Sequence, residues 1–353
     1  MKNLFSLFFY LISKISQKFI LYNKKIFFII IKIILILLFS FLIVISYINL
    51  PNHIIYKNYI NVAYSFDKDY HYITHVSMKS IMLNQNNDTF INFYLLVSNL
   101  TNNQKDVIDR ISLEHINCKI NYIDMGNKFK EFKIPLNIWS TANFYRINLQ
   151  DILPNEKKIL YLDTDTLIYK DLTKIYNYNI SGKYYTGMLE NMGKSFYERF
   201  NISCDNYINT GVILCNLEEL RKGNISNKIK EFLIKKNNSL QFPVNDPTNY
   251  ITFHKNGYFT PEYVVIGFCN EKDPFNYYNQ SKLKVNVSDV VKAYKDPYIY
   301  HFILHIKPWR GLPNIYGQIC IDPLIRFYEM AKKTHYYYKI LNKFPIYYST
   351  IID

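Results

Sequence analysis

After residue 59, the pattern of apolar and polar residues alternates between helix-like and strand-like segments. Helical spacing of apolar residues covers 70–83 and continues after Thr101, where Gln104 completes a capping box, and a further helix is predicted over 140–152. Between these segments, strand-like runs rich in β-branched and aromatic residues cover 60–65, 90–97, 120–123 and 159–162. Alternating strands and helices predict an α/β domain with a largely parallel sheet, and such sheets bind ligands outside the carboxyl ends of their strands.

The N-terminal part follows another pattern. Residues 26–48 are apolar apart from Lys32, Ser40 and Ser46, close to the ~20 residues that a helix needs to cross a bilayer. No small-residue cleavage site follows, which favours an uncleaved membrane anchor. The alternatives are a removed signal peptide and an amphipathic helix over 1–25 that lies in the interface.

The distribution of positive charge predicts how the anchor is oriented in the membrane. The chain has 42 Lys+Arg and 28 Asp+Glu, a net charge of +14, and seven of these cations precede the first acid, Asp67: Lys2, Lys14, Lys18, Lys24, Lys25, Lys32 and Lys57. The remaining +7 (14 − 7) is too mild to indicate nucleic-acid binding. Lysines ahead of the span place the N-terminus in the cytoplasm, so the sequence predicts a single-pass type II membrane protein.

Two carboxylates, Asp163 and Asp165, directly follow the apolar strand over 159–162. Paired acids at the end of a buried strand repel each other unless a hard cation such as Mg²⁺ or Mn²⁺ bridges them. Taken alone, the two acids could also belong to a solvated loop or a helix cap, with no metal bound.

A second strand, predicted over 298–303, leads into another polar group. His301, His305 and Lys307 share one face of an extended chain and offer an imidazole ligand and a cation for a diphosphate. The alternative is an edge strand that ends at Pro308, with Trp309 packed in the core.

Five ordered segments between Asn61 and Trp309 resemble glycosyltransferase family 8. The segments are Ala63 to Tyr70, Phe144-Tyr145-Arg146, Ile159 to Asp165, Tyr207 to Leu214 and His301 to Trp309. The resemblance implies a GT-A fold, Rossmann-like with a mixed and mainly parallel sheet. It also implies a retaining hexosyltransferase that moves a hexose from a UDP-sugar to a hydroxyl of a glycan, lipid or protein.

The resemblance also implies a role for individual residues. Metal ligands for Mn²⁺ or Mg²⁺ are Asp163, Asp165 and His301. Nucleotide and donor contacts are Ala63, Asp67, Asp69, Tyr70, Arg146, Thr164, Asn209, Gly211 and Lys307. Residues near the reacting sugar are Glu190, Asn245, Asp246 and, again, Arg146. The expected divisions are a basic cytoplasmic segment 1–25, an anchor 26–48, a stem 49–58, a catalytic domain 59–310 and a helical basic-aromatic tail 311–353.

Two departures from the family pattern leave other functions open. Val244 stands where the family has an aspartate that grips the donor sugar, and Leu304 replaces a glycine near the phosphates. A catalytically inactive sugar- or nucleotide-binding scaffold with the same fold is therefore an alternative, and a metal-dependent phosphohydrolase is a second one.

In a eukaryotic cell the catalytic domain is expected in the lumen of the Golgi or endoplasmic reticulum, and in a bacterium the protein is expected to be membrane-associated.

Overall fold

The computed structural model describes two separate units, residues 1–55 and 56–353. Described residues in the first unit are 10, 14, 24–48 and 55. In the second unit they are 56–132, 140–190, 200, 207–236, 240–266, 287–303, 307–310 and 321–343. Leu304 and His305 lie outside the described residues, as do most of segment 1–25 and of stem 49–58.

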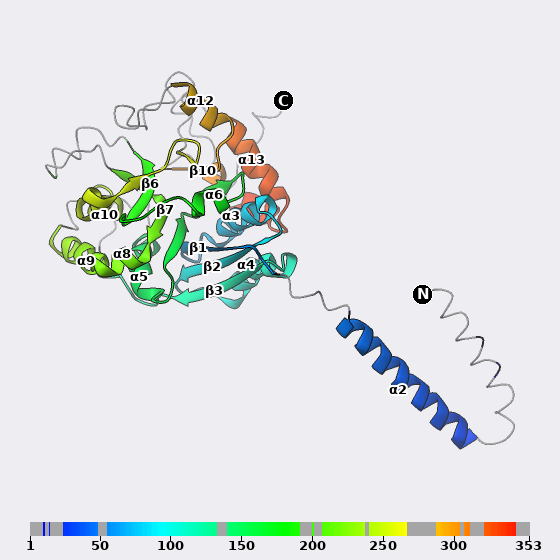
Figure 1. The fold of residues 1–353 in the computed structure, drawn as a ribbon. Coiled ribbons are helices and arrows are strands. Elements are labelled where there is room, and N and C mark those ends of the chain that lie inside the picture. Colours follow the sequence, from blue (N-terminus) through cyan, green and yellow to red (C-terminus); the bar gives the residue numbers. More distant parts are fainter. Residues whose placement is uncertain are drawn as a thin grey trace. The chain divides into compact units, whose positions relative to one another are not determined.

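The N-terminal unit contains helix α2 (Lys24–Ile48) (Figure 1). No helix among the described residues is both long enough and apolar enough to span a membrane. The anchor predicted over 26–48 is therefore found as a helix but is not supported as a membrane span.

Two sheets form the frame of the larger unit. A seven-stranded sheet has the order β3-β2-β1-β4-β7-β6-β8, and a three-stranded sheet has the order β5-β10-β9. The larger sheet contains β1 (Asn58–Phe66), β2 (Thr89–Val97), β3 (Cys118–Asp124), β4 (Lys158–Leu162), β6 (Tyr185–Leu189), β7 (Ile208–Asn216) and β8 (Gly257–Tyr258). The smaller sheet contains β5 (Thr166–Ile168), β9 (Val264–Ile266) and β10 (Ile299–His301).

The first half of the large sheet is parallel, as the alternating pattern predicts. Helices α3 (His71–Asn84) and α4 (Asn102–Glu114) connect β1, β2 and β3, and the predicted capping box of Thr101 and Gln104 is present. The chain then returns to the other side of β1, where β4 pairs with it in parallel. This change of direction between β1 and β4 is the place where open α/β sheets bind ligands.

The second half of the sheet is mixed. Strand β7 runs antiparallel to both β4 and β6, while β6 and β8 are parallel. The predicted α/β class with a mixed, mainly parallel sheet is therefore confirmed. Helices on this side are α8 (Leu217–Lys222), α9 (Ile225–Lys236) and α10 (Asn245–Thr252), followed by the 3-10 turn η5 (Phe253–Lys255).

The helix predicted over 140–152 has a different form. Residues Thr141–Asn148 wind as the 3-10 helix η2, and only Leu149–Ile152 form an α-helical turn, α5. Thr141, Asn143 and Asn148 are weak α-helix formers because their side chains bond to nearby backbone groups or lose rotamer freedom. A further short helix, α6 (Thr173–Tyr176), follows β5.

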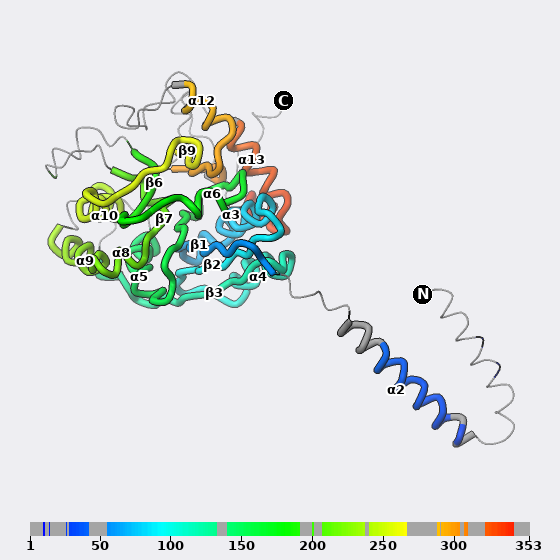
Figure 2. The backbone as a smooth tube through the Cα atoms, in the orientation of Figure 1, coloured from blue at the N-terminus to red at the C-terminus, as the bar shows by residue number. Residues whose placement is uncertain are grey.

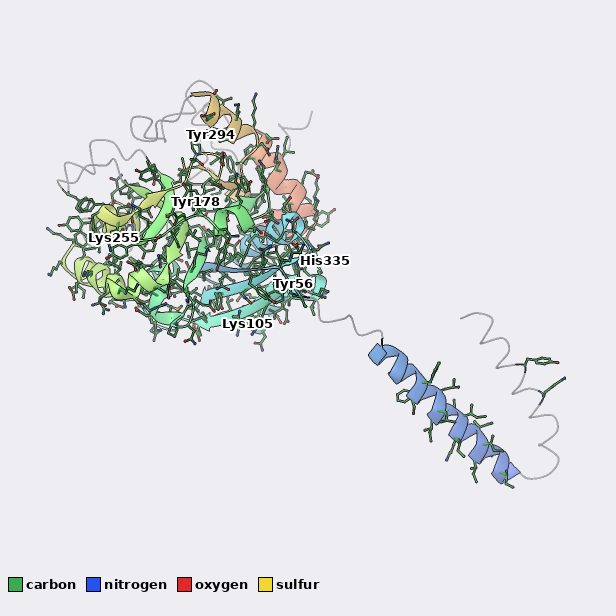
Figure 3. All side chains as sticks on the ribbon, in the orientation of Figure 1. Tyr56, Lys105, Tyr178, Lys255, Tyr294 and His335 are labelled. Atoms are coloured by element: carbon green, nitrogen blue, oxygen red, sulfur yellow. The ribbon has the colours of Figure 1, made fainter. Side chains whose placement is uncertain are left out.

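The C-terminal part packs on the main domain. Its elements are α12 (Val287–Lys295), η6 (Pro308–Arg310), α13 (Ile321–Lys332) and α14 (Tyr337–Lys343), and the last two lie within the helical tail predicted over 311–353 (Figure 2). Tyr336 contacts the rings of Tyr72 and His75 in α3. His335 pairs with Glu114 of α4 at 3.3 Å (Figure 3).

Candidate active site

The two acids of the Asp-x-Asp segment are held at the end of buried strand β4. The Asp163 amide donates to the carbonyl of Gly211 in β7 at 2.6 Å. The Thr166 hydroxyl donates to the Asp163 carbonyl at 2.8 Å, which closes the turn into β5. Thr164, between the acids, is buried. The backbone of this turn is therefore fixed by two neighbouring strands.

His301 reaches the same place from the other sheet. Strand β10 pairs antiparallel with β5, and their register sets His301 opposite Thr166. Nε2 of His301 lies 3.2 Å from Oδ1 of Asp165 and 3.7 Å from Oδ2 of Asp163. The predicted ligands thus come together from two separate sheets.

These three residues fit a divalent metal ion. Their donor atoms all lie within 4.8 Å of one another, and two carboxylates with one imidazole suit Mn²⁺ and related ions. Oδ1 of Asp165 is buried and accepts no well-formed hydrogen bond from the residues that the structure describes, although Nε2 of His301 lies 3.2 Å from it. A buried oxygen without a hydrogen bond is costly unless something else satisfies it, and a metal ion at this point would do so.

Arg146 is fixed against Asp163. Its Nη2 donates to Oδ1 of Asp163 at 2.6 Å, its Nη1 donates to the Thr210 carbonyl at 2.7 Å, and its Nε donates to the Asn143 carbonyl at 3.1 Å. The guanidinium also lies 4.4 Å from the ring centre of Tyr161. These contacts hold the guanidinium in place, so that Arg146 orients the candidate metal ligand Asp163.

Lys307 neutralises the second acid. Its buried ammonium donates to Oδ2 of Asp165 and to the Phe302 carbonyl. Burial alone would raise the pKa of Asp165, but Lys307 and His301 beside it hold the pKa of this carboxyl below its ordinary value. Asp165 is therefore ionised, which is the state required of a carboxylate that is to hold a metal ion.

Gly211 lies against both the histidine and the first aspartate. A Cβ atom built on it would lie 2.5 Å from Oδ2 of Asp163 and 2.9 Å from Nε2 of His301, and closer still to Cε1 of that imidazole. Only a residue without a side chain fits here. Gly211, which the resemblance places among the nucleotide and donor contacts, is thus also required by the packing of Asp163 and His301.

Glu190 and Asn209 form a second polar group beside the metal ligands. Glu190 follows β6, and its Oε2 accepts from Nδ2 of Asn209 at 3.2 Å. Oδ1 of Asn209 accepts from the Gly211 amide at 2.8 Å, which links this pair to the metal side. Burial raises the pKa of Glu190 to about 7, while the hydrogen bond from Asn209 acts in the opposite direction.

The raised pKa of Glu190 predicts a pH-dependent stability. Because the folded protein binds this proton more tightly than the unfolded chain, whose carboxyl has the ordinary value of 4.5, the contribution of Glu190 is fully present below pH 4.5 and is lost as pH rises through 7. Between pH 5 and pH 8, the free energy of unfolding of the wild type should fall by about 2.5 kcal/mol more than that of Glu190→Gln. Urea unfolding at both pH values tests this, and parallel pH profiles for the two proteins would contradict it.

The neighbouring residues Asn245 and Asp246 make different contacts. Oδ1 of Asn245 accepts from the Thr210 hydroxyl, beside the strand residues that line the metal group. Asp246 is fully buried, and its carboxylate accepts from the Tyr207 hydroxyl at 3.1 Å and from the Phe242 amide at 3.0 Å. Asp246 therefore holds the start of α10 against β7, which is a positioning role.

The surroundings of Val244 account for a valine where the family pattern has an aspartate. Its side chain is 5% exposed and packs in an apolar cluster with residues of β4, β7 and α9. A carboxylate in this apolar cluster would lose its hydration, which is unfavourable unless a cation or hydrogen-bond donors accompany it. The valine therefore serves packing.

Four of the predicted nucleotide and donor residues, Ala63, Asp67, Asp69 and Tyr70, lie in β1 or directly after it. Ala63 is buried within the strand. Asp67 accepts from the Asp69 amide at 2.9 Å through Oδ1, which shapes the turn into α3. Tyr70 begins α3 and lies edge-on to Trp309, with ring centres 6.4 Å apart. This turn follows the strand that neighbours β4, so it adjoins the metal group in the sheet order.

Tyr161 is the supporting residue that the sequence did not reveal. Its hydroxyl donates to Oδ1 of Asp163 at 2.9 Å and pairs with the Ser65 hydroxyl at 2.6 Å. Burial raises its pKa well above the ordinary value, so the hydroxyl keeps its proton and remains a donor. In the sequence Tyr161 is one more aromatic residue of an apolar strand, and only its place two residues before Asp163, on the same face, could have indicated the contact.

Comparison with known proteins gives this site a family. The model of glycosyl transferase family 8 matches residues 61–312. A putative glycosyltransferase of Haemophilus influenzae is 24% identical over 191 residues, which are 53% of this chain and 58% of the relative. The lipopolysaccharide 1,2-glucosyltransferase of Escherichia coli K12 is 22% identical over 279 residues, 77% of each chain. The match to the Haemophilus protein thus spans little more than half of that relative.

Solved structures agree on the fold. A crystal structure of the galactosyltransferase LgtC, in complex with donor and acceptor sugar analogues, superposes with a TM-score of 0.64 at 18% identity, over 78% of this chain and 96% of that one. The larger unit therefore has the GT-A-like fold. Because the family model also covers most of the chain, from the first strand to just beyond Trp309, the protein belongs to glycosyl transferase family 8.

Proposed function

We propose that this protein is a metal-dependent retaining hexosyltransferase that moves a hexose from a UDP-sugar to a hydroxyl of a glycan, lipid or protein. The observation that carries the proposal is the convergence of Asp163, Asp165 and His301 at the change of strand direction, with Lys307 beside them. Family membership and a fold shared with a transferase solved with donor and acceptor analogues support it.

The residues of the site have separable tasks in such a reaction. A divalent ion held by the two aspartates and His301 would neutralise charge that develops on the leaving diphosphate. Arg146 and Tyr161 fix the orientation of Asp163. Lys307 offers a further cation to the diphosphate.

The sugar is proposed to lie beside Glu190, Asn209 and Asn245. Glu190 has a pKa of about 7, so near neutral pH its carboxyl can be present as a hydrogen-bond donor as well as an acceptor toward a sugar hydroxyl. Asn209 connects this group to Gly211. Because discrimination between hexoses depends on such hydroxyl contacts, the donor sugar is to be identified by experiment.

The decisive experiment is donor turnover by the full-length protein. A panel of UDP-sugars is incubated with Mn²⁺, and UDP release is followed before and after a chelator is added. We expect metal-dependent release from one sugar, stopped by the chelator. A folded protein that releases UDP from no sugar but binds it would favour the inactive scaffold, and release of inorganic phosphate would favour a phosphohydrolase.

We further propose that the N-terminal unit attaches the enzyme to a membrane. Support comes from the lysines of the first 32 residues and from the exposed apolar side chains of α2, which are Ile26, Phe28, Ile29, Ile33, Leu35, Ile36, Leu37, Phe39 and Phe41. Cell fractionation should find the full chain with membranes and a chain lacking residues 1–55 in the supernatant. Equal distribution of the two would contradict the attachment.

A further inference from the structure

Each acid of the metal site already has a buried cation as its partner. Arg146 pairs with Asp163 at 2.6 Å, and Lys307 pairs with Asp165. The side chains of Arg146 and Lys307 are only 6% and 10% exposed, so solvent screens these pairs weakly. The two carboxylates and the two cations balance, and a divalent ion that arrives alone would add two uncompensated positive charges.

The two cations differ in how firmly they are held. Arg146 is fixed by Asn143 and Thr210 in addition to Asp163, and it lies over the ring of Tyr161. The Lys307 ammonium donates to Asp165 and to the Phe302 carbonyl, at the end of a flexible four-carbon stem. Lys307 is therefore the cation that can change partner.

The backbone beneath Lys307 is anchored. Pro308 follows it, and its carbonyl accepts from the Tyr328 hydroxyl of α13. Trp309 is fully buried against Tyr70 and against Phe327 of α13, with ring centres 6.4 Å and 5.4 Å apart. The described residues that follow Lys307 are thus held in place, and its flexible side chain can change partner by rotation.

We propose that Lys307 couples metal binding to nucleotide binding. Without nucleotide, its ammonium stays on Asp165 and opposes the divalent ion, because like charges a few ångströms apart in a buried site repel strongly. The diphosphate of a UDP-sugar carries two negative charges, which balance the ion and give the ammonium a new partner. This inference rests on the proposed transferase function, and it makes Lys307 the residue through which metal and nucleotide assist each other.

Linkage sets the form of the test. If UDP tightens Mn²⁺ binding by some factor, Mn²⁺ must tighten UDP binding by the same factor. We expect a factor of about ten or more in the full-length wild type, within the usual range of such couplings. The free Mn²⁺ signal in electron paramagnetic resonance gives the Mn²⁺ affinity, with UDP absent or saturating, once the Mn²⁺ bound by UDP in a protein-free sample has been subtracted. No turnover is needed.

The variant Lys307→Met removes the charge and keeps the length of the side chain. It should bind Mn²⁺ alone about tenfold more tightly than the wild type, and the added effect of UDP should shrink to about threefold or less. Lys170→Met is the matched control, because Lys170 also pairs with an aspartate, Asp296 at 2.6 Å, but contacts none of the metal ligands. The control should retain the coupling of the wild type.

The possible results separate this inference from the function on which it rests. Unchanged or weaker Mn²⁺ binding by Lys307→Met would overturn the inference, and so would wild-type Mn²⁺ binding that ignores UDP, a result that needs no variant. Failure of the wild type to bind Mn²⁺ even with saturating UDP would refute the metal-dependent function itself. If Lys307→Met is too unstable for binding measurements, its melting temperature is compared with and without Mn²⁺, in the absence of UDP. The Mn²⁺-induced rise should be larger for Lys307→Met than for the wild type, and an equal rise would count against the coupling.

Discussion

Asp163→Asn should lower metal-dependent UDP release by about a thousandfold or more while the protein stays folded. The asparagine has the shape of the aspartate, and its carbonyl oxygen can accept the hydrogen bonds that Arg146 and Tyr161 donate to Oδ1. Those two donors force the amide group of the new side chain to the position of Oδ2, which faces His301. A metal ligand is thereby replaced by an N–H donor.

The matched control for this variant is Asp296→Asn. Asp296 is an exposed acid that pairs with Lys170 outside the site, so its loss should leave turnover unchanged. Turnover of Asp163→Asn within tenfold of the wild type, at saturating Mn²⁺, would refute the assignment of Asp163 as a ligand. A lower melting temperature without a loss of turnover would show that Asp163 serves stability alone.

The parts of the fold that follow from local patterns could be predicted from the sequence. Strand β1 lies where a strand was predicted over 60–65, and α4 begins with the capping box of Thr101 and Gln104. The Asp-x-Asp segment lies at the end of a buried strand for the same reason, since a short, continuous apolar run followed by two acids suffices to locate it. These features depend on neighbours in the sequence.

Features that depend on distant segments could not be predicted in this way. The predicted strand over 298–303 is shortened to β10 and belongs to a separate sheet with β5 and β9. No local pattern predicts the pairing of β10 with β5, although this pairing places His301 beside the two aspartates. Asp246 was placed near the sugar by its position in a motif, and the hydrogen bonds that it accepts from Tyr207 and Phe242 are contacts that the motif does not reveal.

Gly211→Ala is expected to disable the site through a single methyl group. The added Cβ would lie 2.5 Å from Oδ2 of Asp163 and 2.9 Å from Nε2 of His301, which is closer than nonbonded carbon atoms approach such atoms. Asp163 cannot easily retreat, because Arg146 and Tyr161 hold its other oxygen. The imidazole must therefore move away from the aspartates.

This displacement predicts a loss of at least about a hundredfold in Mn²⁺ affinity with UDP present, since removing even the partners that orient a ligand costs ten- to a hundredfold. Gly182→Ala is the control: its φ of 68° also disfavours alanine, but no atom lies within 4 Å of the added Cβ. Gly182→Ala should lower the melting temperature slightly and keep Mn²⁺ affinity. Gly211→Ala should lose Mn²⁺ affinity out of proportion to any change in melting temperature. If both variants lose the same stability and both keep the metal, the close approach at Gly211 has no part in forming the metal site.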